Sequence, residues 1–376
     1  MADVYANSVF TIAASGASSC DQGLFTIRDP LQVAGCKLYE LPPTGSGNRT
    51  ASVSVTPRQS EFPSPLSTRG WALQERLFAP RTLEFGSLIS WECKTVICSE
   101  LKPDLTQSRE TPLIKNIFDS FEQPGISQSQ SALFVWNHEI VRLFTKARLT
   151  QKSDRLMAIS GTIRRLSDQR DWENIYGLWA PFLVQQLLWE SYSRDNSAPW
   201  SSKRSGVAPV WSWASITGPV GYYFASWSIT ITNSFSPKVV LALNTPTATQ
   251  SYDRVASQLT SLTLKGHLFE LRIQEYFITR KPWCGAAIGR EMPFKWSFQS
   301  EISDALIKTP CFFLLLSVCQ IWELASEIVS GLALIKAPNM PGTYERIGLV
   351  EGELKYLSRK LRRQIDVPPT QDATII

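Results

Sequence analysis

Apolar positions recur with a helical period in GWALQERLF, residues 70–78. Trp71, Glu75 and Phe78 stand at i, i+4 and i+7, so the spacing predicts a helix that carries these three side chains on one face. A surface helix normally keeps its charges on the face away from its large apolar residues. Glu75 is therefore out of place in the pattern, and its position needs a structural or a chemical reason.

The period changes to two directly after this helix. RTLEF and LISWEC flank Gly86-Ser87, which predicts a hairpin with a two-residue type II′ turn. In that register Phe85 faces Leu88, and Glu92 falls on the side of Leu83. The other side holds Glu84, Ile89, Trp91 and Cys93. Both sides would be mainly apolar, and we expect both to be covered.

The flanking segments give weaker signals. Residues 2–6 have the character of the last turn of a helix, and residues 9–14 that of a buried strand, which needs neighbours. Either the chain begins inside a domain, or this strand pairs with strands much further on. Residues 51–57 fit a short edge strand, and the polar, proline-punctuated residues 100–130 a linker or excursion.

Helical spacing returns in the middle of the chain, where NHEIVRLFTKARLT leads into SDRLMAISGTIRRLSD, residues 153–168. The second segment has an apolar stripe and Ser153 as N-cap. The stripe consists of Leu156, Ile159, Ile163 and Leu166. NIYGLWAPFLVQQLLWE, residues 174–190, also has helical spacing, and Pro181 should bend this helix or mark its start.

From about residue 205 the pattern is one of loops and strands. VAPVWSWASITGPV is a loop rich in Pro and Trp, and strand-like content marks 227–233, 262–273, 311–318 and 330–337. We therefore expect an α+β protein. Its parts would be an incomplete α/β unit over residues 1–100, a linker over 101–130, and an α+β region over 131–365 with a helical pair and a mostly β remainder.

The composition is that of a folded chain, with 43% hydrophobic and 19% charged residues in 376. A net charge of +5 is mild, and we interpret the basic run SRKLRRQ as a solvated helix face, with nucleic acid or anionic lipid as the alternative. Seven dispersed cysteines without CxxC and two histidines predict no metal site. The longest apolar run, CFFLLLSVC, is too short for a membrane span, and no signal peptide is visible, so we expect a cytoplasmic protein. No alternation of arginine and aromatic residues accompanies the basic run, so we expect no binding to nucleic acid.

Several stretches together resemble the fungal heterokaryon incompatibility (HET) domain family. MADVYANSVFTIAAS with DQGLF is similar to the domain's middle helix and strand, and STRGWALQERLFAPRTLEFGSLISWEC with Ser99-Glu100 to its closing signature. DRLMAISG, YGLWAPFLVQQLLW, PVWSWASITGPV and YERIGLV are similar to the tail attached to it in filamentous fungi. Family members begin with further strands and helices ahead of the VYANS helix, so the resemblance implies a truncated domain in this chain.

The resemblance implies a role in allorecognition and programmed cell death, with other incompatibility or signalling proteins as partners. The family has been proposed to be distantly similar to TIR domains, some of which hydrolyse NAD with a glutamate. Under that alternative Glu75 is a catalytic carboxylate beside Trp71, Arg69 and Gln74 orient phosphate or ribose, and NAD is a substrate. No cofactor is otherwise expected.

A structural role is the preferred interpretation of Glu75. Its carboxylate would accept hydrogen bonds from backbone amides or from Arg69, Arg76 or Arg81, and so fasten the helix to the hairpin. Glu92 would likewise pair with an arginine on the helix. The polar cluster, whether it binds or stabilises, comprises Arg69, Trp71, Gln74, Arg76, Arg81, Trp91 and Glu92. Three interpretations stay open: an assembly module, an enzyme that uses Glu75, and a non-functional remnant. The oligomeric state is not determined by the sequence.

Overall fold

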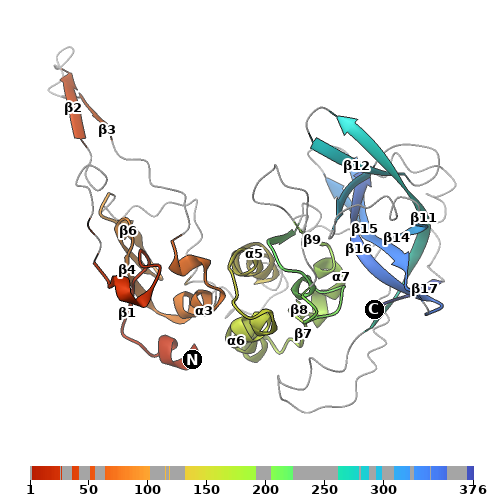
Figure 1. The fold of residues 1–376 in the computed structure, drawn as a ribbon, viewed down its shortest axis with the longest axis horizontal. Helices are drawn as coiled ribbons and strands as arrows, with labels where there is room; N and C mark the ends of the chain where they lie inside the picture. Colours follow the sequence, from red (N-terminus) through yellow and green to blue (C-terminus); the bar gives the residue numbers. More distant parts are fainter. Residues whose placement is uncertain are drawn as a thin grey trace. The chain divides into compact units, whose positions relative to one another are not determined.

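The computed structural model describes residues 2–25, 27, 36–41, 51–55, 64–101, 115, 118, 132–191, 205–222, 261–278, 281–287, 294–298, 309–321, 326–338, 340–353 and 371–376. The chain forms two compact units (Figure 1). The N-terminal unit contains residues 1–123, 147–149 and 158–162, and the C-terminal unit contains the remainder. Both helices and strands are present, so the predicted α+β class is confirmed.

A four-stranded mixed sheet forms the centre of the N-terminal unit. Its order is β1 (Thr11–Ala13), β4 (Arg81–Phe85), β5 (Ile89–Cys93) and β6 (Ile97–Ser99). β1 runs parallel to β4, and the other neighbours are antiparallel. The strand predicted over 9–14 thus exists over Thr11–Ala13 and pairs with a strand much further along the chain, but the prediction that it is buried was wrong, because Val9, Phe10 and Ile12 are exposed.

The predicted hairpin exists, but its register differs by one residue from the prediction. Phe85 pairs with Ile89 and Leu83 with Trp91, so the loop has three residues, not two, and the II′ turn was wrong. Leu88 is buried in the loop instead of pairing in the ladder. A shift of one residue moves every side chain of a strand to the other face. Glu92 therefore shares a face with its pairing partner Thr82, and the expectation of two mainly apolar faces was wrong too.

Two helices belong to the same unit. α1 (Ala2–Ala6) packs on α3 (Gly70–Phe78), which the 3₁₀ turn η2 (Leu66–Thr68) precedes. The helix over 70–78 is confirmed, but its buried residues are Gly70, Gln74, Leu77 and Phe78. Trp71 and Glu75 lie at the edge of this face and are only half-buried. A short 3₁₀ turn, η1 (Cys20–Gln22), follows β1.

A separate two-stranded hairpin also belongs to this unit. β2 (Cys36–Leu41) pairs antiparallel with β3 (Ala51–Val55), which confirms a strand in the segment predicted over 51–57. Figure 1 shows this hairpin standing away from the four-stranded sheet. It is called the arm below.

Helical segments occupy residues 132–170. Residues 132–135 are α-helical and continue through the π-helical turn η5 (Trp136–Val141) into α5 (Arg142–Lys146). Two 3₁₀ turns, η6 (Lys152–Arg155) and η7 (Met157–Ile159), lead into α6 (Ser160–Arg170). The predicted stripe is buried at Ile159, Ile163 and Leu166. Ser153 is not the N-cap, because it lies inside η6 and α6 begins seven residues later.

The long helix predicted over 174–190 was wrong. β7 (Asn174–Ile175) and β8 (Leu178–Trp179) form a tight hairpin there, followed by η8 (Ala180–Phe182), α7 (Leu183–Gln186) and β9 (Trp189–Ser191). Tyr176 and Gly177 both have positive φ, 50° and 87°, as a two-residue hairpin turn requires. Pro181 does mark the start of a helical turn, η8, as one alternative predicted.

Tryptophans form the core beside this hairpin. Trp136, Trp179, Trp189, Trp211 and Trp213 are fully buried. The Nε1 atoms of Trp136 and Trp213 both donate hydrogen bonds to the carbonyl oxygen of Gly177, at 3.2 and 3.0 Å. A Cβ atom at Gly177 would lie 2.5 Å from the Trp213 ring, so this turn accepts only glycine. The Pro/Trp loop carries the 3₁₀ turn η9 (Trp213–Ser215) and ends in β10 (Val220–Tyr222), which pairs with β9.

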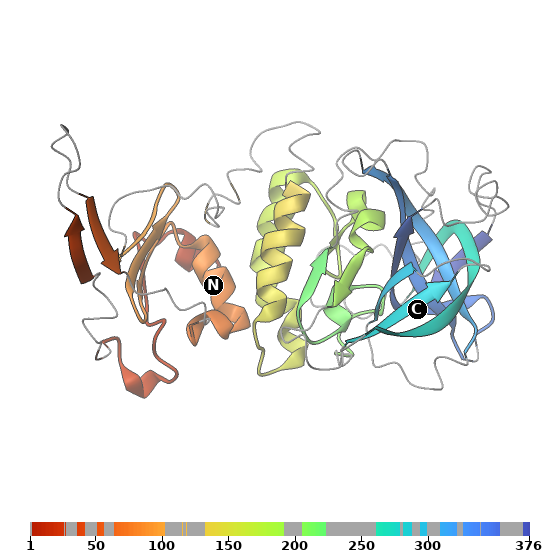
Figure 2. The same ribbon diagram turned by 90° about the horizontal axis from the view of Figure 1, so that it is seen from above.

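The remaining strands form one sheet with the order β12-β13-β16-β15-β14-β11-β17 (Figure 2). They are β11 (Leu262–Ile278), β12 (Lys281–Ala287), β13 (Phe294–Phe298), β14 (Cys311–Ile321), β15 (Ser326–Lys336), β16 (Thr343–Glu353) and β17 (Gln371–Ile375). Strands predicted over 262–273, 311–318 and 330–337 are confirmed, as is the mostly β character of this region. The strand predicted over 227–233, the basic run over 358–364 and most of the 101–130 linker lie outside the described residues.

Within the described residues, no helix combines the length and the apolar character that crossing a membrane requires.

His138 gives the C-terminal unit a predicted sensitivity to acid. Burial, and then the charge of Arg142, lower its pKa from 6.5 to about 4. Between these two values the unfolded chain binds a proton that the native protein does not bind, so native stability is lost as the pH falls through this window. We expect a loss on the order of 2–3 kcal/mol between pH 6.5 and pH 4.

Urea unfolding at the two pH values measures this loss. His138→Phe keeps an aromatic ring beside Phe134, whose ring centroid lies 4.5 Å from that of His138, and removes the titrating group. The variant should lose less stability than the wild type over the same window. Equal losses in the two proteins would assign the acid sensitivity to other groups.

Candidate functional site

The N-terminal end of α3 is held by backbone contacts with a distant segment. The amide of Gly70 donates to the carbonyl of Arg148 at 2.9 Å, and the amide of Arg148 donates to Thr68 at 2.6 Å. A Cβ atom at Gly70 would lie 2.5 Å from the side chain of Leu149, so this close approach requires glycine. These contacts fix where α3 begins and thus the direction of its side chains.

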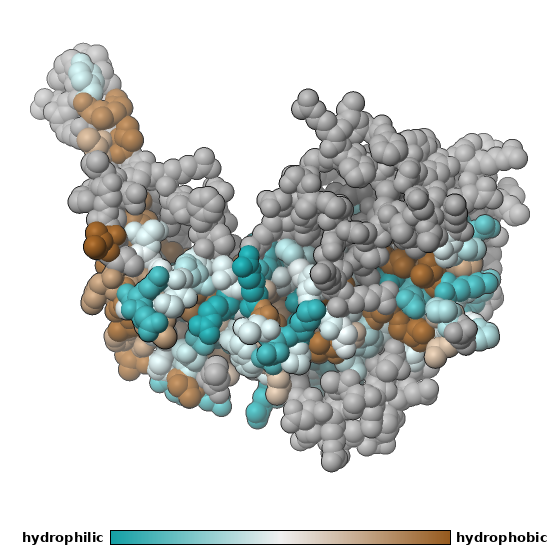
Figure 3. Space-filling view, in the orientation of Figure 1, coloured by the Kyte–Doolittle hydropathy of each residue, from teal (hydrophilic) through white to brown (hydrophobic). Residues whose placement is uncertain are grey.

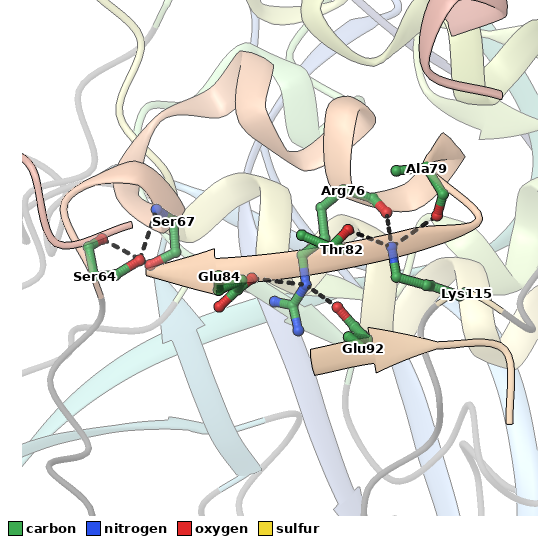
Figure 4. A network of polar contacts seen from close by, with 8 residues as sticks. All are labelled: Ser64, Ser67, Arg76, Ala79, Thr82, Glu84, Glu92 and Lys115. Atoms are coloured by element: carbon green, nitrogen blue, oxygen red, sulfur yellow. Dashed lines mark hydrogen bonds and ion pairs between the residues drawn. The ribbon is translucent and has the colours of Figure 1, made fainter. Parts of the chain in front are cut away.

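A cluster of polar side chains joins α3 to the hairpin. It consists of Arg76, Thr82, Glu84, Glu92 and Lys115, and Figure 4 shows them around the C-terminal half of α3. Arg76 donates from Nε to Glu92 Oε2 at 2.7 Å, and the same Nε lies 3.9 Å from Glu84 Oε1. The predicted pairing of Glu92 with an arginine of the helix is therefore present. We call this set the α3–hairpin cluster.

Lys115 completes the cluster from a segment far along the chain. Its Nζ donates to the carbonyl oxygens of Arg76 and Ala79, at 2.8 and 2.7 Å, and lies 2.8 Å from Thr82 Oγ1. The last carbonyls of a helix have no partner within the helix, and a cation at this end also interacts favourably with the helix dipole. Lys115 is almost fully buried, so all three donors of its ammonium group serve the protein's own fold.

The pKa values of the two cations of the cluster are shifted in opposite directions, that of Arg76 upward by the carboxylates and that of Lys115 downward by burial. Burial alone would lower the pKa of Arg76, but the charge and hydrogen bond of Glu92, and then the charge of Glu84, raise it overall. Burial lowers the pKa of Lys115 to about 8, and Glu92 opposes this only in part. Arg76 is thus the cation that the two carboxylates stabilise, and Lys115 is held mainly by hydrogen bonds.

One oxygen atom of Glu92 has no hydrogen-bond partner among the described residues. Glu92 Oε1 is buried and accepts no hydrogen bond from that part of the chain, whereas Glu92 Oε2 accepts one from Arg76. Glu92 is engaged by Arg76, and Lys115 is too buried and too fully bonded to act as a nucleophile. The geometry of the cluster therefore stabilises the joint between helix and sheet.

Glu75 lies outside this cluster. Burial, and then the interaction with the Glu75 carboxylate, raise the pKa of Tyr5 in α1, so the two side chains lie near one another. Burial is the larger cause. The contact joins α3 to α1, not to the hairpin, and the ion pair that fastens α3 to the hairpin is Arg76–Glu92.

The other residues of the predicted polar cluster lie in separate places. Gln74 is buried, and its Nε2 donates to the carbonyl of Ala158. Arg81 donates to the carbonyl of Val9 at 3.1 Å, and the side chain of Arg69 is exposed. Trp91 precedes Glu92 in β5, and successive side chains of a strand alternate, so Trp91 lies on the opposite face of the sheet. Trp71 is half-buried on α3.

Two residues that shape this region, Lys115 and Tyr5, were not among those predicted from the sequence. Lys115 stands among apolar residues, Leu113, Ile114, Ile117 and Phe118, but it is 36 residues from its partner Ala79, and no local pattern links the two. Tyr5 had a weak signal, since it lies on the short predicted helix. Among the described residues, no group of three or more His, Cys, Asp or Glu side chains is arranged to hold a metal ion.

Comparison with known proteins identifies the N-terminal segment. Residues 1–75 match the family model described as heterokaryon incompatibility protein (HET), which is consistent with part of a HET domain at the N-terminus. The matched segment contains α1 and β1, which lie in MADVYANSVFTIAAS, and α3 up to Glu75, which lies at the start of STRGWALQERLFAPRTLEFGSLISWEC. No curated protein matches the chain. No solved structure matches it either.

The Arg76–Glu92 pair gives a matched pair of test variants. Glu92→Gln removes the charge from a buried side chain in contact with Arg76, and we expect a loss of about 2 kcal/mol in the free energy of unfolding of the N-terminal unit. Glu84→Gln alters the longer contact to the same Arg76 atom, on a more exposed side chain, and should lose less than about 0.5 kcal/mol. Guanidinium-induced unfolding measures both, and equal losses would refute the central position of Glu92.

Proposed function

We propose that this chain acts in heterokaryon incompatibility, as a cytoplasmic protein of a fungus that recognises a genetically different partner and promotes cell death through assembly with other proteins. The observation that carries the proposal is the match of residues 1–75 to the HET family. The family name supplies the biological process, and assembly is our inference about the mechanism.

The contacts made by the polar side chains support a role through protein assembly over a role in catalysis. Arg76, Glu92 and Lys115 hold α3 to the hairpin, and Gln74 is committed to a backbone carbonyl. Glu75 lies near Tyr5 and is half-buried. An active site keeps its reacting groups within reach of a substrate, whereas Arg76, Glu92, Lys115 and Gln74 bind one another or the backbone.

Expression in a filamentous fungus tests the proposed process. We expect induced expression of the full chain to reduce the viability of hyphal compartments, measured by uptake of a vital dye, while an empty vector has no effect. A chain carrying Gly177→Val, which places a side chain against Trp213, serves as a misfolded control at matched transcript level. Full viability with folded wild-type protein present would contradict a role in cell death.

A further inference from the structure

Exposed apolar side chains are concentrated in the N-terminal unit. Among the described residues, the large exposed hydrophobic side chains of this unit are Val4, Val9, Phe10, Ile12, Phe25, Ile27, Leu38, Tyr39, Val53, Val55 and Ile97. The C-terminal unit has only Met157 and Met340 among its described residues. Figure 3 shows the corresponding apolar surface on the arm and beside β1 and β4. A concentration of this kind marks an interaction surface.

One face of the four-stranded sheet is apolar. Thr82 and Glu92 point toward α3 and Lys115, so the residues that alternate with them point the other way. On that side Ile12 pairs with Leu83, which pairs with Trp91, and Phe85 pairs with Ile89. None of these five side chains is fully buried, and Ile12 is 53% exposed.

Phe25 extends this surface. Its ring meets that of Phe85 edge to face, with 5.5 Å between centroids, yet Phe25 remains 80% exposed. We call the set of Ile12, Phe25, Leu83, Phe85, Ile89 and Trp91 the open face.

The arm is amphipathic. Its register pairs Tyr39 with Val53 and Cys36 with Val55, whereas the alternate pairs, Lys37 with Ser54 and Glu40 with Ser52, consist of polar residues. Tyr39, Val53 and Val55 are all about half exposed. A two-stranded hairpin is marginally stable alone in water, so an arm of this pattern needs a surface to cover its apolar side.

From the open face and the arm we propose that two copies of this chain form a dimer in which the arm of each copy lies, apolar side down, on the open face of the other. This names a second copy as a partner in the assembly proposed above, and its biological meaning rests on that proposal. The chain carries both halves of the contact, so a two-fold axis generates two identical contacts and a closed pair.

The exposed area is close to what such a dimer needs. Ile12 and Phe25 of the open face, with Leu38, Tyr39, Val53 and Val55 on the arm, are each about half exposed or more, and the other four members of the open face are partly exposed. At roughly 150–200 Å² for a large side chain, these ten side chains expose on the order of 700 Å² of apolar surface per copy. A stable interface needs about 800 Å² from each partner.

The mass of the purified full chain in solution, measured by light scattering after size exclusion, tests the proposal. We expect twice the 42.2 kDa of the chain. The double variant Tyr39→Thr/Val53→Thr keeps β-forming residues but removes the apolar side of the arm, and should raise the dimer dissociation constant by roughly tenfold or more. Ile12→Thr/Phe25→Ser should do the same from the open face. Ser54→Thr, at a polar pair of the arm, is the matched control and should leave the dimer intact.

Mixing the two double variants distinguishes this geometry from other dimers. Each variant alone lacks both contacts, but a mixed pair retains one intact contact between the normal arm of one copy and the normal open face of the other. We therefore expect heterodimers on mixing. A monomeric wild type, whose open face is then covered by its own arm or by a different protein, would overturn the proposal. An arm variant that dimerises as tightly as the wild type would overturn it too.

The test is independent of the proposed biological process. It uses purified protein, so a dimer without any effect on hyphal viability leaves the interface standing and refutes only the role in cell death. Loss of viability caused by a wild type that is monomeric refutes the interface and leaves the role. Circular dichroism and the melting temperature of each variant, expected to match those of the wild type, separate loss of contact from loss of fold.

Discussion

Arg346→Met is expected to lower the free energy of unfolding of the C-terminal unit by about 4 kcal/mol. Arg346 on β16 is fully buried, and its guanidinium group donates to the carbonyl oxygens of Leu187, at 2.6 Å, and of Trp189. It also stacks over the ring of Trp189, with 3.9 Å from Cζ to the ring centroid. Methionine fills much of the volume but leaves both buried carbonyls without a donor.

The controls for this prediction separate charge from geometry. Arg346→Lys keeps the charge, but an ammonium group cannot donate to both carbonyls and stack flat on Trp189, so we expect it to lose about half as much. Arg164→Met, at an exposed arginine 3.9 Å from Asp168, should change stability by less than about 0.5 kcal/mol. Urea unfolding followed by tryptophan fluorescence measures all three, and an Arg346→Met variant as stable as Arg164→Met would contradict the account.

Lys115→Met is expected to destabilise the N-terminal unit by about 3 kcal/mol at neutral pH. The substitution leaves the carbonyls of Arg76 and Ala79 and the hydroxyl of Thr82 without the ammonium donor, in a place that water does not reach. Guanidinium-induced unfolding gives the loss. Lys94→Met, at an exposed lysine of the same unit, is the matched control and should have little effect.

The loss of stability caused by Lys115→Met depends on pH, because the pKa of Lys115 in the wild type is lowered. Burial lowers that pKa from 10.5 to about 8, so between these values the unfolded chain binds a proton that the native protein lacks. The free energy of unfolding of the wild type therefore rises with pH in this window relative to Lys115→Met. The difference between the two proteins should be larger at pH 10 than at pH 7.5, and a difference that shrinks over this range would show that Lys115 stays charged.

The sequence predicted those parts of the N-terminal unit that local patterns determine. Helical spacing identified α3, and the alternation after it identified β4 and β5. The pairing of Glu92 with an arginine of the helix followed from the cost of an unpaired buried carboxylate, and Arg76 is that arginine. Glu75 was also expected to fasten the helix to the hairpin. It lies near Tyr5 of α1 instead, a contact that the helical pattern alone did not indicate.

The errors have two physical causes. A hairpin's register depends on loop length, and Leu88 gains more by burial in a three-residue loop than by pairing with Phe85, which reverses the faces of β5. Residues 174–190 have helical spacing, but the positive φ values at Tyr176 and Gly177 and the packing of Trp213 on Gly177 favour a tight hairpin. Lys115 could not be predicted, because its partners are brought to it only by the tertiary fold.

The central claim is that this chain acts through assembly and not through a reaction at Glu75, and the viability of hyphae that express Glu75→Gln tests it most directly. Glutamine keeps the shape of the side chain and an oxygen that can accept from the nearby Tyr5 hydroxyl, so the melting temperature should match the wild type within a few degrees. At matched protein levels, we predict that Glu75→Gln reduces viability as strongly as the wild type, with cellular NAD unchanged in both. Full viability with a folded Glu75→Gln protein, together with loss of NAD in the wild type alone, would contradict the account.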